Sequence, residues 1–273
     1  MAEHAPWVMG FPLAAMAKHG LIEPTRVRAD QVQAVLRFFA VSTPEVWRQQ
    51  WLEPRASFRR SARYASKAQA LSVWLRWGED RAGELQPPAF DFERVRGSIP
   101  SLRALTLLHP VAFRPRLNAI LAEAGVVLLL HPELPGTRVM GATHWVGNNP
   151  VIQLSLRHKS DDHFWFALFH EIAHVLRNER RQIYLDIAGA PATDDDERAA
   201  NALAREILIP EEAYRRFCAD GVFSAGSVRA FAAAIGITPG IVVGRLQFDE
   251  RIRPPQLSYL KQRFEWQGER KAR

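Results

Sequence analysis

The sequence predicts a mainly helical α+β fold in which a small three-stranded sheet packs on one central helix. Residues 164–178, FWFALFHEIAHVLRN, form an apolar run without Pro or Gly that is typical of a buried helix. Three short β-rich segments precede this run: VVLLLHPEL, RVMGATHWVG and PVIQLSLR, separated by Pro-Gly and Gly-Asn-Asn-Pro turns. The chain on either side has helical patterns, so we expect helical regions to flank the sheet.

The composition narrows the classes of protein to which this chain can belong. The 273 residues are 47% hydrophobic and 24% charged, enough for a substantial core in one large domain or two small ones. The net charge of +7 permits a nucleic-acid or acidic partner without requiring one, since 36 basic residues face 29 acidic ones. The single cysteine, Cys218, excludes an intrachain disulfide and a Cys-rich zinc module. No stretch has the pattern of a signal peptide or the length of a membrane span, so we expect a cytoplasmic protein.

Residues 1–105 are predicted to be a helical N-terminal region. Asp30 is a plausible cap for a helix over residues 31–41. Residues 42–45, Ser-Thr-Pro-Glu, are a helix-start signature with Pro in the first turn. A long helix is expected over residues 67–85, and the Pro-Pro dipeptide that follows it prevents its continuation.

A group of basic residues lies between the last two of these helices. It predicts either a phosphate-binding patch or a solvated connection with a few salt bridges, and the second is favoured because charge runs are usually solvated. The group consists of Arg55, Arg59, Arg60, Arg63 and Lys67.

Residues 106–215 are predicted to be the central domain. A helix that ends at Gly125 leads into the three strands. The central helix then begins at Ser160-Asp161-Asp162, whose carboxylates suit the positive end of the helix dipole, and runs to about Arg177. Residues 180–189 are a short extended segment, and an alanine-rich helix follows up to Pro210.

Residues 216–273 are predicted to be a helical C-terminal region packed on the central domain. Within it, FAAAIGITPGIVVGRLQ has the pattern of a helix, a glycine-containing turn and a second helix. Gly236 and Gly240 are expected at the turn. This pattern has a superficial likeness to a helix-turn-helix motif.

The central helix carries the sequence His170-Glu171-Ile172-Ala173-His174, an H-E-x-x-H motif. At 3.6 residues per turn, the two histidines lie one above the other on a single helix face, where they can bind one zinc ion. Glu171 is then placed to act as general base. Because such a short pattern also arises by chance, the hypothesis depends on a third ligand.

Glu197 is the best candidate for that ligand, since hydrolytic zinc sites use three protein ligands. It begins an E-x-x-A-N sequence on the following helix, and the small residues Ala200, Asn201 and Ala204 share its face. This face can pack closely against the central helix with Glu197 directed at the metal. The acidic residues at positions 194–196 are rivals, but they are out of phase with that face and have the placement of first-turn dipole residues.

The segment GATHWVGNNPVIQLSLRHKSDDHFWFALFHEIAH, followed by ERAANALAREILIP, resembles the ImmA/IrrE family of bacterial metallopeptidases. The likeness extends forward to IGITPGIVVGRLQ and LKQRFEW. It extends back to GLIEPTRVRADQVQAVLRFFAVSTPEVWRQQW and WLRWGE. These segments resemble the subgroup in which the peptidase follows an XRE-type helix-turn-helix domain. The resemblance covers most of the chain, and the two zinc motifs are its most specific part.

The resemblance implies a zincin-like fold of the small gluzincin type. It implies zinc held by His170, His174 and Glu197, with Glu171 as general base. Family members cleave or inactivate a cognate XRE-type repressor, often in response to stress, or belong to toxin–antitoxin-like and mobile-element loci. The XRE-type domain of the subgroup has no counterpart here, so we expect it to be lost or supplied by another chain. Asn178 stands where the family often has a histidine, and we assign it no role.

The mechanism expected from zinc chemistry is the attack of a water, with its pKa lowered to roughly 7, on a peptide carbonyl, while Glu171 accepts the proton. The strand at residues 150–157 is expected to offer its edge to an extended substrate. His163, on the same helix face two turns before His170, and Tyr184, between the two ligand-bearing helices, are possible auxiliary residues, as is Asn201. A structural role is the alternative for each.

The competing hypothesis is a non-catalytic regulator that binds DNA or a partner protein. The net charge, the basic group and the helix-turn-helix-like segment favour it. A structural zinc site would need a fourth protein ligand and no base beside the first histidine. In addition, Arg245 is the only basic residue between Ala230 and Asp249. We therefore expect a zinc-dependent endopeptidase whose substrate is an XRE-type repressor, with nucleic-acid binding by this chain left open.

Overall fold

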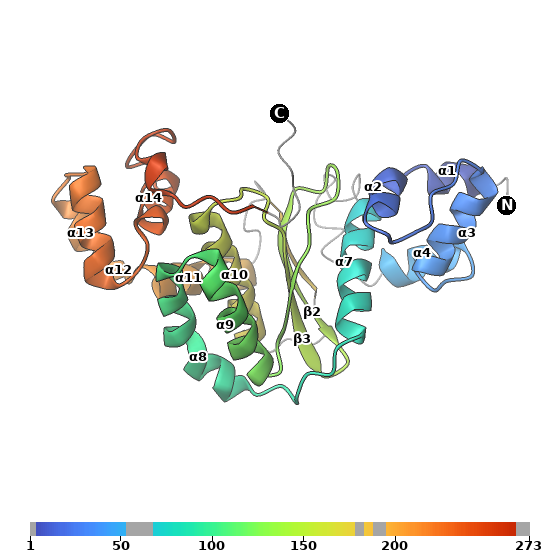
Figure 1. Cartoon of the computed structure of the whole chain (residues 1–273), viewed down its shortest axis with the longest axis horizontal. Helices are drawn as coiled ribbons and strands as arrows, with labels where there is room; N and C mark the ends of the chain where they lie inside the picture. The colour runs from blue at the N-terminus through green and yellow to red at the C-terminus, as the bar shows by residue number, and fades with distance from the viewer. Residues whose placement is uncertain (1–3, 53–67, 178–182, 188–194, 266–273) are drawn as a thin grey trace.

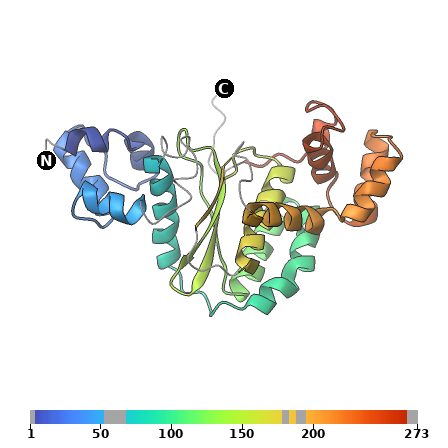
Figure 2. The same ribbon diagram turned by 180° about the vertical axis from the view of Figure 1, so that it is seen from behind.

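A mixed β-sheet stands at the centre of the molecule, with helices on both of its faces (Figure 1). The computed structural model describes residues 4–52, 68–177, 183–187 and 195–265. Seen from behind, the N-terminal helices and the C-terminal helices form lobes on opposite sides of the sheet (Figure 2). The fold is therefore α+β and mainly helical, as the sequence predicts.

The N-terminal lobe begins with four short helices. They are α1 (Ala5–Val8), α2 (Leu13–Lys18), α3 (Arg28–Phe38) and α4 (Pro44–Trp51). The start of α4 is as predicted, because the Thr43 hydroxyl accepts a hydrogen bond from the Val46 N–H at 3.3 Å. The prediction for Asp30 was wrong. Helix α3 follows Val27, whose N–H donates to the Thr25 hydroxyl, so Asp30 lies inside the first turn.

Helix α7 (Ala68–Gly83) covers one face of the sheet. Its Leu71, Trp74 and Leu75 are buried. The Gln153 side chain donates to the Trp74 carbonyl at 2.7 Å and so ties α7 to the sheet. Of the basic group, all five members lie outside the described residues, so the choice between a phosphate-binding patch and a solvated connection stays a prediction.

Within the described residues, the sheet has four strands in the order β1-β3-β2-β4. Strands β1 (Val127–Leu130), β2 (Val139–Val146) and β3 (Asn149–Leu154) are the three predicted from the sequence. The fourth, β4 (Tyr184–Ile187), is part of the predicted extended segment and pairs antiparallel with β2. Strand β3 is parallel to β1 and antiparallel to β2.

This strand order corrects one prediction. Strand β3 lies between β1 and β2, and its backbone groups pair on both sides. It cannot offer an edge to a substrate. The pairing of distant segments is a tertiary property that the local pattern of residues 150–157 does not encode.

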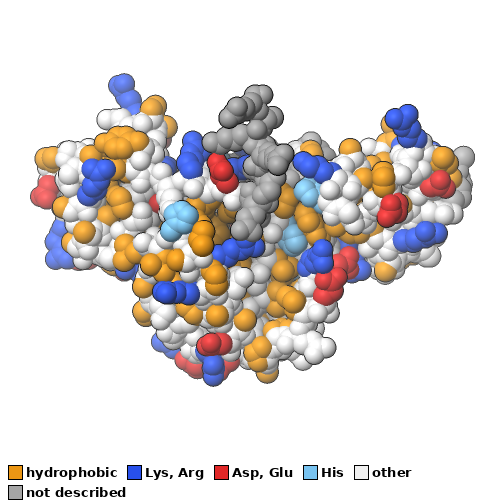
Figure 3. Space-filling model, in the orientation of Figure 1, with side chains coloured by type: hydrophobic (Ala, Val, Ile, Leu, Met, Phe, Trp, Pro, Cys, Tyr) orange, Lys and Arg blue, Asp and Glu red, His pale blue; other side chains and the backbone are white. Residues whose placement is uncertain are grey.

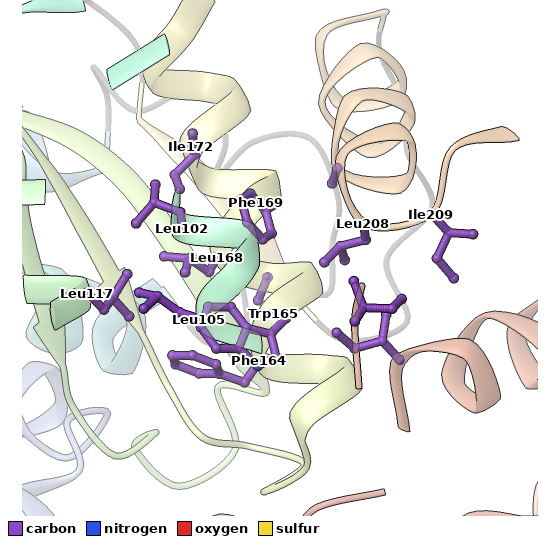
Figure 4. Packing of buried hydrophobic residues seen from close by; sticks show 14 of the residues in the cluster. Leu102, Leu105, Leu117, Phe164, Trp165, Leu168, Phe169, Ile172, Leu208 and Ile209 are labelled. Carbon is purple, nitrogen blue, oxygen red and sulfur yellow. The ribbon is translucent and has the colours of Figure 1, made fainter. Parts of the chain in front are cut away.

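The other face of the sheet is covered by the central helix α10 (Asp161–Arg177) and by two helices beside it. These are α8 (Phe92–Ala104) and α9 (Pro110–Glu123). The 3-10 turn η2 (Leu105–Leu107) joins α8 to α9, and Gly125 at φ +73° follows the end of α9 as predicted. In Figure 4, Trp165, Phe169 and Ile172 of α10 lie in the same core as Leu102 and Leu105.

Helix α11 (Asp195–Leu208) packs on α10 in the antiparallel direction. Arg177 at the end of α10 forms an ion pair with Asp196 at the start of α11. At the other end of the pair, Leu208 and Ile209 belong to the same hydrophobic core as α10. The candidate site lies in the long interface between these two helices.

The chain ends in further helices, of which α14 packs on the start of α10. They are α12 (Glu211–Ala219), α13 (Ala225–Ile235), α14 (Pro239–Phe248) and the 3-10 turn η3 (Ser258–Leu260). Gly236, at φ +71°, makes the predicted turn between α13 and α14. Gly240 is not at the turn but inside α14, where its missing side chain makes room for the Asp161 carboxylate. Gly244 does the same for Asp162, and a Cβ there would lie 2.5 Å from Oδ2.

The buried hydrophobic residues form two large clusters. One extends from α8 through the sheet and α10 to the C-terminal helices, and the other joins the N-terminal helices to α7 and the adjoining sheet face. The division into residues 1–105, 106–215 and 216–273 stays a prediction, although α12 to α14 share the core of the sheet and α10.

Within the described ranges, no single helix is long and apolar enough to cross a membrane. Helices α13 and α14 meet the length and composition criteria only when they are taken together, and the pair is bent by 113°.

Asp161 and Asp162 begin α10 and are both buried, yet they are held differently. Asp162 accepts hydrogen bonds from Lys261 at 2.7 Å and from the Ser160 hydroxyl at 2.7 Å. Burial would raise the pKa of Asp162, but contacts with His163, Lys261 and Ser160 outweigh it and hold this pKa below its usual range. Burial and the neighbouring Asp162 charge raise the pKa of Asp161 to about 6.

Replacing Lys261 with Met is expected to lower the free energy of unfolding by about 3 kcal/mol at pH 7, because Asp162 stays buried without its cation. A carboxylate whose pKa is lowered by folding adds stability above the pKa of about 4 that it has in the unfolded chain. That stability is lost as the pH falls. The difference between the variant and the wild type should therefore be largest near pH 7 and should shrink below about pH 4, as measured by urea unfolding.

The matched control is Lys18→Met, which removes the same charge from an exposed position on α2. We expect it to change stability by less than about 0.5 kcal/mol at either pH. A loss for Lys261→Met that is equally large at pH 7 and pH 3 would contradict the assignment to the Asp162 ion pair.

Candidate metal centre

Three side chains from two helices meet at one point between α10 and α11. The Nε2 atoms of His170 and His174 are 3.1 Å apart. The Glu197 carboxylate lies 3.4 Å from His170 Nε2 and 3.5 Å from His174 Nε2, one oxygen facing each ring. Both histidines are buried, whereas the Glu197 side chain is 22% exposed. The structure thus brings together the three residues that the sequence predicts as metal ligands.

The helix geometry explains this convergence. His170 and His174 are one turn apart on α10, so they project from the same face. Glu197 is in the first turn of α11, and the buried Ala200 and Ala204 on its face allow the two helices to approach closely. Each ligand is therefore carried by a helix rather than by a loop, which fixes its position.

The acidic rivals of Glu197 have other partners. Asp195 forms an ion pair with Arg198 on the exposed side of α11, and Asp196 pairs with Arg177. Asp194 lies outside the described residues. Of the acidic residues described at the start of α11, Glu197 is the one grouped with the histidines.

Glu171 follows His170 in α10 and has no exposed surface. Its Oε2 accepts a hydrogen bond from the Thr143 hydroxyl of β2 at 2.7 Å. Its other oxygen, Oε1, has no hydrogen-bond partner in the described part of the chain. Oε1 lies against Gly141, where a Cβ would be only 2.4 Å away. A glycine at this position of β2 is therefore needed for the carboxylate to fit.

Strand β4 brings two more side chains to the site. The Tyr184 ring stacks on the His174 ring, with centroids 3.8 Å apart and planes 17° apart. Asp186 forms a second possible metal-holding group with His170 and Glu171. Asp186 could not be predicted from the sequence, because its proximity depends on the pairing of β4 with β2, which sets Asp186 opposite Gly141.

Several ionisable side chains lie close together in this buried region, and their pKa values are shifted as a result. Burial, with nearby Asp186 and Glu197, raises the pKa of Glu171 to about 8 despite the opposing effects of His170 and Thr143. Burial would lower the pKa of His170, but Glu197, Glu171 and Asp186 raise it to about 9. Burial, His170 and Arg177 lower the pKa of His174 to about 2. A metal ion that binds here must displace the His170 proton, because only the neutral imidazole is a ligand.

The remaining predicted auxiliary residues do not belong to the group of three ligands. His163 is two turns before His170, where its Nδ1 contacts Asp162 and the Ser160 hydroxyl and its ring stacks on His158. Asn201 lies one turn after Glu197 on α11 and is half-buried. A catalytic role for either residue stays a prediction.

The donor atoms suit a transition metal ion such as zinc. Two imidazole nitrogens and a carboxylate are a usual catalytic zinc set, which keeps a further position for water or substrate. The three donor atoms lie within 4.8 Å of one another, and the lone carboxylate is the most exposed of the three side chains. Buried Glu171 adds a carboxylate oxygen that no described hydrogen-bond donor satisfies. These observations fit a site built to hold a metal.

A comparison with known families gives an independent result. Residues 124–247 match the family described as the IrrE N-terminal-like domain, Peptidase_M78. The matched segment runs from just before β1 almost to the end of α14 and so includes the sheet, both ligand-bearing helices and the C-terminal helices. A search of curated proteins gave no match.

Metal analysis of the purified chain is expected to give about one zinc per chain. Because His170 belongs to both possible groups, the variants that distinguish them are Glu197→Ala and Asp186→Asn. We expect Glu197→Ala to lose most of the zinc and Asp186→Asn to keep it. Asp195→Asn, which changes an exposed acid on the same helix, is the control and should keep it as well. Retention of zinc in Glu197→Ala together with its loss in Asp186→Asn would transfer the site to the second group.

Proposed function

Residues 124–247 of this chain belong to the IrrE N-terminal-like peptidase family, and on this basis we propose that the chain is a zinc-dependent metalloendopeptidase. It would hydrolyse a peptide bond inside a protein substrate. The observation that carries the proposal is the joint placement of His170, His174 and Glu197 beside a buried glutamate. A metal site with a purely structural role has no need for a buried carboxylate next to its first histidine.

The chain's own residues supply the binding and proton-transfer steps. His170, His174 and Glu197 would hold zinc, which when bound lowers the pKa of water and polarises a carbonyl. Glu171 accepts the proton of the attacking water on Oε1, while Thr143 holds Oε2. The same carboxyl then gives the proton to the leaving amine. A pKa raised by burial suits this carboxyl to both tasks near neutral pH.

Strand β4 is the part of the sheet best placed to align a substrate. It is an edge strand beside the metal centre, and its outer side has no partner strand among the residues that the structure describes. An extended peptide that pairs with β4 would pass the three ligands with its backbone held by main-chain hydrogen bonds. Tyr184, on the same strand, keeps the His174 ring in position by stacking.

For the substrate we propose an XRE-type transcriptional repressor in the cytoplasm, as part of a stress, mobile-element or toxin–antitoxin-like system. The support is the resemblance of the segments quoted above to the ImmA/IrrE family. The alternative, a non-catalytic regulator that binds DNA through α13 and α14, has less support. Ile241, Val242 and Leu246 of α14 are buried, and its two glycines are packed on α10, so this helix is a core element.

The change Glu171→Gln is expected to abolish cleavage and to leave zinc content unchanged. Glutamine keeps the shape of the side chain but cannot accept the proton, and loss of a general base costs about 10²- to 10⁴-fold in rate. The test incubates the zinc-loaded chain with the XRE-type repressor encoded beside it and follows the repressor by mass spectrometry. Full zinc occupancy without cleavage of any neighbouring repressor by the wild type would favour the regulator hypothesis.

The change Gly141→Ala tests the position of Glu171 without removing it. The added Cβ would lie 2.4 Å from Glu171 Oε1 and 2.9 Å from Leu154, so the carboxylate must move. Displacement of a catalytic group by about 1 Å costs on the order of 100-fold in kcat/KM. We expect that loss with zinc retained. Gly97→Ala in α8, where an added Cβ meets no atom within 4 Å, is the control; equal activity of the two variants would contradict this role of Gly141.

A further inference from the structure

A cavity of about 310 Å³ lies between α10, α11 and α14, outside the group of metal ligands. Its walls are mainly apolar and include Phe166, Leu208, Ile241 and Phe248. Its size is at the lower end of the range for pockets that bind small ligands. In Figure 3, the surface between the C-terminal helices and the sheet is hollowed, with hydrophobic side chains on its floor and a histidine nearby.

The cavity lies next to the metal ligands along α10 and α11. Phe166 lines it and also stacks on the His170 ring, with centroids 6.2 Å apart. His163, another wall residue, is two helical turns before His170, which corresponds to about 10 Å. On the antiparallel α11, the wall residues Arg205 and Leu208 follow Glu197 by two and three turns. The cavity therefore begins about one turn from the metal centre and extends for about one more.

The charge at the cavity indicates what it binds. Arg245, on the α14 wall, forms ion pairs with Asp249 and Glu211. Arg205 differs: its guanidinium lies over the Phe248 ring at 4.8 Å and forms no ion pair with a carboxylate in the described ranges. The Phe248 ring is itself 67% exposed. An apolar cavity with an unpaired cation at its wall fits an apolar group that has a carboxylate close to it.

We propose that this cavity is the specificity pocket of the peptidase. It takes a large apolar side chain of the substrate, two or three residues from the scissile bond, and Arg205 binds a neighbouring Asp or Glu of the same peptide. An extended peptide advances about 3.3 Å per residue, so two or three residues span the distance from the metal centre to the cavity. This inference rests on the proposed function, since it assigns the substrate class of the same site.

The test measures cleavage of a synthetic mixture of 14-residue peptides of varied sequence by the zinc-loaded full chain, read by mass spectrometry. We expect cleaved peptides to share a large apolar residue two or three positions from the cut, with an acidic residue close to it. In Arg205→Glu, kcat/KM for such peptides should fall on the order of tenfold, and basic residues should be preferred near the apolar one. Arg216→Glu, an exposed arginine on α12, is the matched control and should keep the wild-type preference.

A second variant tests the cavity itself. Leu208→Phe adds volume to its wall and should shift the preferred side chain from large to small, with zinc content unchanged. Cleavage without any such preference, or a preference that Arg205→Glu leaves unchanged, would overturn the pocket and leave the proposed function intact. Absence of all peptide and repressor cleavage would overturn both. A further outcome is that dodecanoate binds to the wild type but not to Arg205→Glu, while all peptides are cleaved equally. The cavity would then be a binding site for a free apolar acid, and the proposal would be overturned.

Discussion

The structure depends on the burial of a helix that carries several ionisable groups. Apart from its C-terminal end, almost all of α10 is enclosed, and His170, Glu171 and His174 lie within this enclosed part. Buried ionisable groups are strongly unfavourable unless they are paired or bind a metal. The surrounding elements meet this requirement in turn: β2 provides Thr143, β4 provides Tyr184, and α11 provides Glu197. The contacts that offset the burial of these ionisable groups are thus the same contacts that assemble the candidate metal centre.

The first residues of α10 are also fixed by specific contacts, although they are not part of the metal centre. Two buried aspartates fit against glycines of α14, and Lys261 from beyond α14 neutralises one of them. The C-terminal helices therefore fix the register and direction of α10. They also form one wall of the apolar cavity, which lies between this anchored end and the metal ligands. A single helix in this way joins an anchoring region, the apolar cavity and the candidate metal centre in order along its length.

Much of this could be predicted from the sequence, because the signals are local. The spacing of His170 and His174 fixes their shared face, and the alanine face of the following helix distinguishes Glu197 from its acidic neighbours. The turn residues mark three of the four strands. What local patterns could not provide was strand order: the sequence placed the substrate edge on β3, whereas β3 is internal and the edges among the described strands are β1 and β4. Asp186 was missed for the same reason, since its place opposite Gly141 exists only once β4 pairs with β2.

The central claim is that His170, His174 and Glu197 form one zinc site with Glu171 beside it. The most direct measurement is anomalous X-ray diffraction at the zinc absorption edge from crystals of the zinc-loaded chain. We expect a single strong peak between the Nε2 atoms of His170 and His174 and the Glu197 carboxylate, with Glu171 outside the coordination sphere. No peak at this position, or a peak coordinated by Glu171 and Asp186 in place of Glu197, would contradict the account.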